Sequence, residues 1–159
     1  MTLENTVLEK LAEWHPPTGR HTLTVPDEAA AWAASVTADR CDVLGCLVWE
    51  LAVRRTAEAP AGETLRGWAD RIAGRVVGLL EPLKVHEIDA ERNEAVLRSV
   101  SPAQRGEKLF YYEVVLHGTA AATVRRYQAT HDSGRREQVA FALTHEVLAK
   151  LAGDLTAAK

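Results

Sequence analysis

The chain has 159 residues, of which 47% are apolar and 26% charged, and its formal net charge is −3. These values are typical of one soluble globular domain, and they exclude a disordered tail, a collagen-like fibre and a disulfide-stapled miniprotein. No apolar run approaches the roughly 18 residues of a membrane-spanning helix, and the small net charge does not indicate a nucleic-acid or membrane partner.

The first third of the chain is expected to be mainly helical. Residues 2–14 repeat apolar side chains every three or four positions, with Thr2 as the N-cap. A short β-prone run follows at 21–25, and a second helix is expected over 27–34. A third helix is expected over 37–55 because four apolar residues fall on one helical stripe. These four are Cys41, Leu44, Val48 and Leu51.

The clearest helical periodicity lies at 63–80, and Pro82 ends it. Its apolar residues are Leu65, Trp68, Ile72, Val76 and Leu79. The pattern then changes to the alternation typical of strands. Two hairpins are predicted from this alternation, and a last helix is predicted over 136–155. The hairpin strands are 83–89 with 94–100, and 108–117 with 121–130.

This order predicts an α+β fold in which strands and helices are segregated. We expect N-terminal helices, then a four-stranded antiparallel meander of two hairpins, then a C-terminal helix packed on the sheet. Residues 1–159 are expected to form one domain, with residues 1–26 as a candidate for a loosely attached arm.

The motifs of common enzyme classes do not occur. The sequence has no phosphate-binding loop, no dinucleotide-binding glycine turn and no serine nucleophile elbow. His145-Glu146 begins like a zinc-protease helix, but Ala149 stands where the second histidine is required. The sequence therefore predicts no catalytic residue and no cofactor.

The two cysteines are expected to be small core residues. On the predicted helix, the five-residue step from Cys41 to Cys46 would leave the two thiols about 140° apart. No metal site is predicted, although Cys46 could still meet His15 or His21 from a distant segment. The acidic start of the chain lacks the features of a signal peptide, so a reduced, cytoplasmic protein is expected.

Residues 98–136 form a locally basic and aromatic region, with seven basic against three acidic residues. If Gly118 and Thr119 are the two central turn residues, Arg126 lies opposite Tyr111 and diagonal to Glu113, and Arg125 lies opposite Tyr112. Adjacent arginines point to opposite faces of a strand. Local pairing is therefore favoured over one basic binding surface.

The leading hypothesis is a non-enzymatic cytoplasmic interaction or adaptor protein that self-associates. It rests on the missing catalytic motifs and on four tryptophans, because tryptophan is enriched at interfaces. Its partner would be another protein or a second copy of the chain. Trp14 is the candidate anchor, and Arg135 and Arg136 are candidates for recruiting an acidic partner.

Two alternatives stay open. The first is a small-molecule-binding protein or enzyme with a pocket between sheet and helices. Its candidate ligand-binding residues are Tyr111, Tyr112, His117 and His86, with Arg125 as an anion clamp. The second, weaker alternative is nucleic-acid binding through residues 98–136, for which the mixture of basic and aromatic residues is suited.

Overall fold

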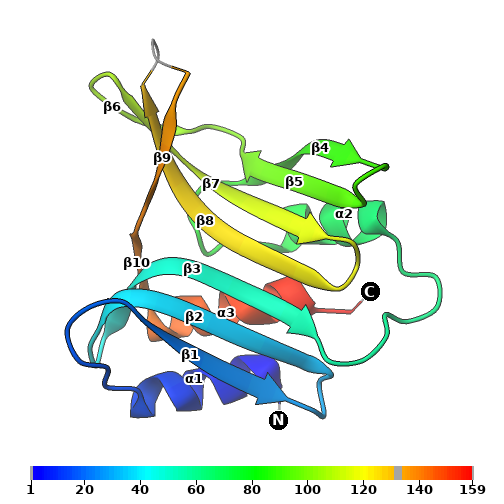
Figure 1. Cartoon of the computed structure of the whole chain (residues 1–159), viewed down its shortest axis with the longest axis horizontal. Helices are drawn as coiled ribbons and strands as arrows, with labels where there is room; N and C mark the ends of the chain where they lie inside the picture. The colour runs from blue at the N-terminus through cyan, green and yellow to red at the C-terminus, as the bar shows by residue number, and fades with distance from the viewer. Residues whose placement is uncertain (1, 131–133, 159) are drawn as a thin grey trace.

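The computed structural model describes residues 2–130 and 134–158, which form one antiparallel sheet of ten strands with three helices (Figure 1). The helices are α1 (Leu3–Glu13), α2 (Leu65–Arg75) and α3 (His145–Thr156). The strands are β1 (His21–Asp27), β2 (Trp32–Cys41), β3 (Gly45–Arg55), β4 (Leu83–Asp89), β5 (Glu94–Ser99), β6 (Ala103–Arg105), β7 (Lys108–His117), β8 (Ala121–Thr130), β9 (Arg136–Val139) and β10 (Phe141–Thr144).

The main strand order is β1-β2-β3-β8-β7-β5-β4, and the helices pack beneath it. Helix α1 contacts β1 and β2, α3 contacts β3 and β10, and α2 contacts β4 and β5. The α+β class is confirmed, but the predicted four-stranded meander is wrong, because six further strands join the sheet. Among the described residues, none of the helices has the length and apolar character needed to cross a membrane.

The predicted helices at 27–34 and 37–55 are wrong, because this segment forms β2, β3 and the end of β1. A β-bulge explains the second half of the misleading helical pattern, the spacing of Val48 and Leu51. Ala38 pairs with Val48 and Thr37 pairs with Glu50, so one residue of β3 is extra at this point. The inward-facing residues Val48 and Leu51 are therefore three positions apart, as on a helix face.

The single helix predicted over 136–155 is also wrong in its first half. Residues 136–139 pair with β8 and residues 141–144 pair with β3. The helix begins only at His145, where the Thr144 hydroxyl accepts a hydrogen bond from the Val147 N–H. A cap of this kind fixes where a helix starts.

Other predicted elements are confirmed. Helix α1 begins after Thr2, whose hydroxyl accepts from the Asn5 N–H. The two hairpins β4–β5 and β7–β8 lie at the predicted positions, with β5 ending one residue early, and α2 lies within the predicted helix but ends at Arg75. Leu3, Val7 and Leu11 of α1 are buried in the core.

Strands β3 and β8 pair over only four residues and then separate, and the chain of β9 and β10 fills the space between them (Figure 1). Strand β9 continues along β8, whereas β10 crosses to β3. This crossing brings the start of α3 to the β2–β3 turn, where the His145 N–H donates to the Leu44 carbonyl at 3.2 Å. Residues about one hundred positions apart thereby become neighbours.

Leu80 combines a left-handed backbone (φ 62°) with a side chain that is 92% exposed. A non-glycine residue with a left-handed backbone destabilises the folded state by about 1–2 kcal/mol. Glycine removes this strain, but it loses more backbone entropy on folding, which costs roughly 0.5–1 kcal/mol. We expect Leu80→Gly to raise the free energy of unfolding by about 0.5 kcal/mol, measured by urea denaturation. The control is Val77→Gly, which replaces an exposed residue with negative φ and should instead destabilise. Destabilisation by Leu80→Gly would contradict the expectation.

Candidate functional site

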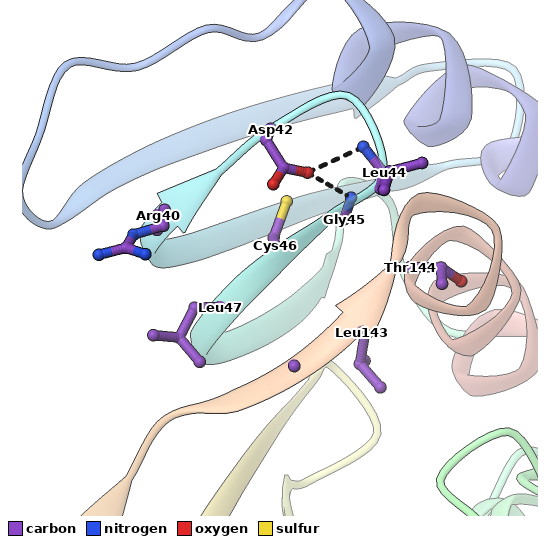
Figure 2. Close-up of a pocket in the computed structure, with 9 residues that line it drawn as sticks. Arg40, Asp42, Leu44, Gly45, Cys46, Leu47, Leu143 and Thr144 are labelled. Carbon is purple, nitrogen blue, oxygen red and sulfur yellow. Dashed lines mark hydrogen bonds between the residues drawn. The ribbon is translucent and has the colours of Figure 1, made fainter.

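The β2–β3 turn is held by Asp42 and Gly45 (Figure 2). One carboxylate oxygen of Asp42 accepts hydrogen bonds from the backbone N–H groups of Leu44 (2.8 Å) and Gly45 (3.0 Å). These two hydrogen bonds lower the pKa of Asp42. A Cβ atom at Gly45 would collide with the backbone carbonyl of Leu143, so close contact with β10 requires glycine here. The turn and β10 therefore fit together tightly.

This turn brings the two cysteines together. Cys41 and Cys46 are directly paired across β2 and β3, with their Cα atoms 4.1 Å apart, and they form a disulfide. The expectation of two thiols on opposite sides of a helix is wrong, because the segment is a hairpin. Since the register itself places the two residues opposite each other, their sulfur atoms stay neighbours whether or not they are bonded.

His145 is the third member of this cluster. Its Nε2 lies 3.6 Å from the Cys41 Sγ, and only 8% of the residue is exposed. The two sulfur atoms and one ring nitrogen all lie within 4.8 Å of one another. His15 and His21, the histidines considered from the sequence, are not part of this group among the described residues.

A hollow of about 430 Å³ opens on the outer surface beside the cluster. Arg40 and Leu47 are paired across β2 and β3 and their side chains point to the same side in Figure 2. The complete lining is Arg40, Asp42, Leu44, Gly45, Cys46, Leu47, Ala142, Leu143 and Thr144. The turn next to it exposes apolar side chains to solvent: Val43 is 79% exposed and Leu44 77% exposed.

Trp14 lies at the same end of the molecule. A Cβ atom at Gly153 would contact the side chain of Glu4, so the start of α1 lies beside the end of α3. The C-terminal end of α1, which Trp14 caps, therefore lies toward the start of α3 and the β2–β3 turn (Figure 1). Trp14 is partly buried and packs against the core.

The residues predicted to bind a ligand lie apart. Tyr112 is buried on the helix side of the sheet, edge-on to Phe141. Its neighbour Tyr111 faces the other side and stacks on Tyr127. His117 lies at the exposed end of β7, where its Nδ1 is 3.8 Å from the Glu94 carboxylate. The structure therefore does not bring Tyr111, Tyr112 and His117 to one pocket.

The expected register of the second hairpin is wrong by one residue. His117 pairs with Ala121, so the turn has three residues rather than two. Glu113 therefore lies opposite Arg125, and Tyr112 lies opposite Arg126. Gly118 takes φ 57°, and a Cβ atom there would contact the Asn93 side chain, which explains why glycine opens this turn.

The arginines of this region pair locally. Glu113 accepts hydrogen bonds from Arg98 at 2.8 Å and Arg136 at 2.6 Å. Arg125 lies 3.3 Å from the Glu50 carboxylate, and Arg126 lies 3.0 Å from that of Glu81. Much of the positive charge counted from the sequence is thus neutralised in place.

Arg136 and Arg135, the two candidates for an acidic partner, differ in their surroundings. Burial alone would lower the pKa of Arg136, but hydrogen bonds to Glu113 and Tyr111 outweigh it and raise that pKa. The guanidinium of Arg136 also lies 3.9 Å from the centre of the Tyr127 ring. Arg135 lines a separate surface hollow beside β8 and β9.

The Cys41–Cys46–His145 cluster was not predicted from the sequence. Two cysteines on either side of a glycine-containing turn are a signal for cross-strand pairing, but only if residues 32–55 are taken as a hairpin. No signal in the sequence links His145 to them. No protein-family model, curated protein or solved structure matches this chain, so its function has to be argued from its own residues.

Proposed function

We propose that the protein is a non-enzymatic cytoplasmic interaction protein that self-associates through the β2–β3 turn. The observation that carries the proposal is the exposure of Val43 and Leu44 beside the hollow that Leu47 lines. We call these three residues the turn surface. Hairpin turns favour glycine, asparagine, aspartate and serine. The formation of the turn therefore does not explain why valine and leucine occupy its centre.

A second copy of the chain is the occupant that best fits this surface. Arg40 and Asp42, of opposite charge, both line the hollow beside the apolar residues. In a two-fold dimer each patch meets itself, so a patch that carries both charges can place Arg40 of one copy near Asp42 of the other. If the charged residues lining the hollow were all acidic or all basic, the hollows of two copies would repel each other.

Specific interfaces bury about 800 Å² on each partner, which is more than the three side chains of the turn surface can provide. The end of α1 capped by Trp14 lies on the same side of the molecule and can supply part of this area (Figure 1). Trp14 thus remains the proposed anchor at the edge of the turn surface. Arg136 is left out of the proposed interface because Glu113 already binds it.

The test replaces Leu44 by aspartate and measures the molecular mass by sedimentation equilibrium over a range of concentrations. We expect the unmodified protein to dimerise and Leu44→Asp to be monomeric, because two buried carboxylates would face each other without partners. The matched control is Leu80→Asp, the same change at an even more exposed leucine on the α2–β4 connection. This control should dimerise like the unmodified protein.

Two outcomes would overturn the proposal. If the unmodified protein is monomeric at high concentration, self-association is refuted. If Leu80→Asp abolishes the dimer and Leu44→Asp does not, the interface lies elsewhere. Circular dichroism of both variants separates loss of association from loss of folding, and both side chains are exposed enough for the fold to tolerate the change.

A further inference from the structure

We propose that Cys41, Cys46 and His145 form a zinc-binding site when the disulfide is reduced. The proposal concerns a site that self-association does not require, and it rests on the proposed function only for the cytoplasmic location, which supplies the reductant. Its basis is the grouping of two sulfur atoms and one imidazole nitrogen within 4.8 Å of one another. Cys46 and His145 are 4% and 8% exposed, and Cys41 is partly buried, so the cluster is largely shielded from solvent.

The distances suit tetrahedral zinc. With Zn–S bonds of about 2.3 Å and Zn–N bonds of about 2.0–2.1 Å, a sulfur and a nitrogen ligand lie about 3.5 Å apart and two sulfurs about 3.8 Å apart. The observed distance from Cys41 Sγ to His145 Nε2 is 3.6 Å. The three ligand atoms already lie within 4.8 Å of one another, so zinc binding requires the two sulfurs, once their bond is broken, to separate to about 3.8 Å.

The elements that hold the ligands do not depend on the disulfide. Backbone pairing sets Cys41 opposite Cys46, and the hydrogen bond from the His145 N–H to the Leu44 carbonyl fixes the start of α3 at the turn. A disulfide across a five-residue separation stabilises a fold by only about 2 kcal/mol through chain entropy. This value is at the low end for disulfides, and the backbone contacts that hold the ligands in place do not require the S–S bond.

The ligand types select the metal. Two thiolates and one imidazole favour Zn²⁺ over Mg²⁺ and Ca²⁺, which prefer oxygen ligands. Asp42 is in the same turn, but it is not grouped with the three ligands among the described residues. Zinc held by three protein side chains completes its tetrahedron with water.

The chemistry requires a reductant of the thiol class, which the cytosol contains. Reduction breaks the S–S bond, takes two electrons and two protons from the reductant, and gives two thiols. Zinc binding then forms two Zn–S bonds and one Zn–N bond and releases the two thiol protons. A small-molecule disulfide, the oxidised form of the same reductant, reverses the step: it takes two electrons from the zinc-bound thiolates and is cleaved to two thiolates, the Cys41–Cys46 bond forms again, and the metal loses both sulfur ligands.

The test uses tag-free protein that has been reduced and then separated from the reductant without air. Titration with Co²⁺ gives the sulfur-to-cobalt charge-transfer absorption of thiolate ligation, and Zn²⁺ affinity follows from competition with a chromophoric chelator. We expect one metal ion per chain. His145→Ala and Cys46→Ser should each weaken Zn²⁺ binding by more than about 100-fold, since even outer-shell partners of a metal site cost 10–100-fold.

The matched control is His15→Ala, which removes an exposed histidine outside the cluster and should leave the affinity unchanged. Because His145 is buried, His145→Asn serves as a second variant that keeps a polar side chain of similar size, and circular dichroism checks the fold of each. The proposal is overturned if the disulfide form binds zinc as tightly as the reduced form. It is also overturned if a folded His145 variant keeps full affinity. Titration of the Leu44→Asp variant separates this result from self-association.

Discussion

Replacing Trp68 by alanine is expected to lower the free energy of unfolding by about 4 kcal/mol, because the change leaves a large cavity in the core. Trp68 is 1% exposed and lies on α2 with its ring centre 5.7 Å from that of Trp32. Its Nε1 donates to the backbone carbonyl of Leu155 at 2.9 Å. One side chain thus joins α2 to β2 and to the last turn of α3.

The measurement is urea denaturation followed by far-ultraviolet circular dichroism. Trp49→Ala is the control, since Trp49 is only partly buried and mainly supports the guanidinium of Arg20, 3.8 Å from its ring centre. We expect the control to lose about 1 kcal/mol. Trp68→Phe should lie between the two, because it keeps an aromatic ring but leaves the Leu155 carbonyl without its donor. Equal losses for Trp68→Ala and Trp49→Ala would contradict this account of the core.

Glu63→Gln is expected to lower the free energy of unfolding by about 3 kcal/mol, because it leaves two largely buried guanidinium groups without a counter-charge. The Glu63 carboxylate binds both Arg55 and Arg71. The exposed fractions of these side chains are 6% for Glu63, 12% for Arg55 and 15% for Arg71. Within the part of the chain that the structure describes, two buried nitrogen atoms of Arg71, Nε and Nη1, have no hydrogen-bond partner, so Arg71 depends on Glu63.

The same carboxylate predicts a pH dependence. The hydrogen bond from Arg71 is the main cause that lowers the pKa of Glu63, and the charges of Arg71 and Arg55 add to it. A lowered folded-state pKa means that the stabilisation is fully present above the pKa of the unfolded chain, and is lost as pH falls through the folded-state value. Below that range, Glu63→Gln and the unmodified protein should differ less in stability than at neutral pH.

Urea denaturation at neutral pH and at a series of acidic pH values tests both statements. Glu58→Gln is the matched control, since Glu58 is exposed in the same connection between β3 and α2. This control should change stability by less than about 0.5 kcal/mol. If Glu63→Gln is equally mild, the ion pairs of Glu63 do not contribute to stability as argued.

The hairpins at 83–130 could be predicted from sequence because their signals are local. Phe110, Tyr112, Val114 and Leu116 alternate along β7, and a short polar turn separates each pair of strands. The register of β7 with β8 could not be predicted with the same certainty. It depends on whether the turn after His117 has two or three residues, and one residue changes every cross-strand partner.

The segments at 27–55 and 136–144 could not be assigned from local pattern. The bulge of β3 produces a spacing of three between Val48 and Leu51, and the alanines of β2 favour a helix when considered alone. Tertiary pairing overrides that preference because a strand next to two neighbours satisfies its backbone hydrogen bonds through the sheet. Tertiary pairing also explains β10, whose residues are extended because they pair with β3.

The α+β class, the helix at the start of the chain and the two hairpins between residues 83 and 130 follow from local sequence patterns, and the sequence lacks the common enzyme motifs. The ten-stranded sheet and the grouping of Cys41, Cys46 and His145 arise from contacts between distant segments. The difference lies in the range over which each interaction acts. Periodicity and turn chemistry act over a few residues, whereas Cys41 and His145 are 104 positions apart and meet only through the crossing of β9 and β10 from β8 to β3.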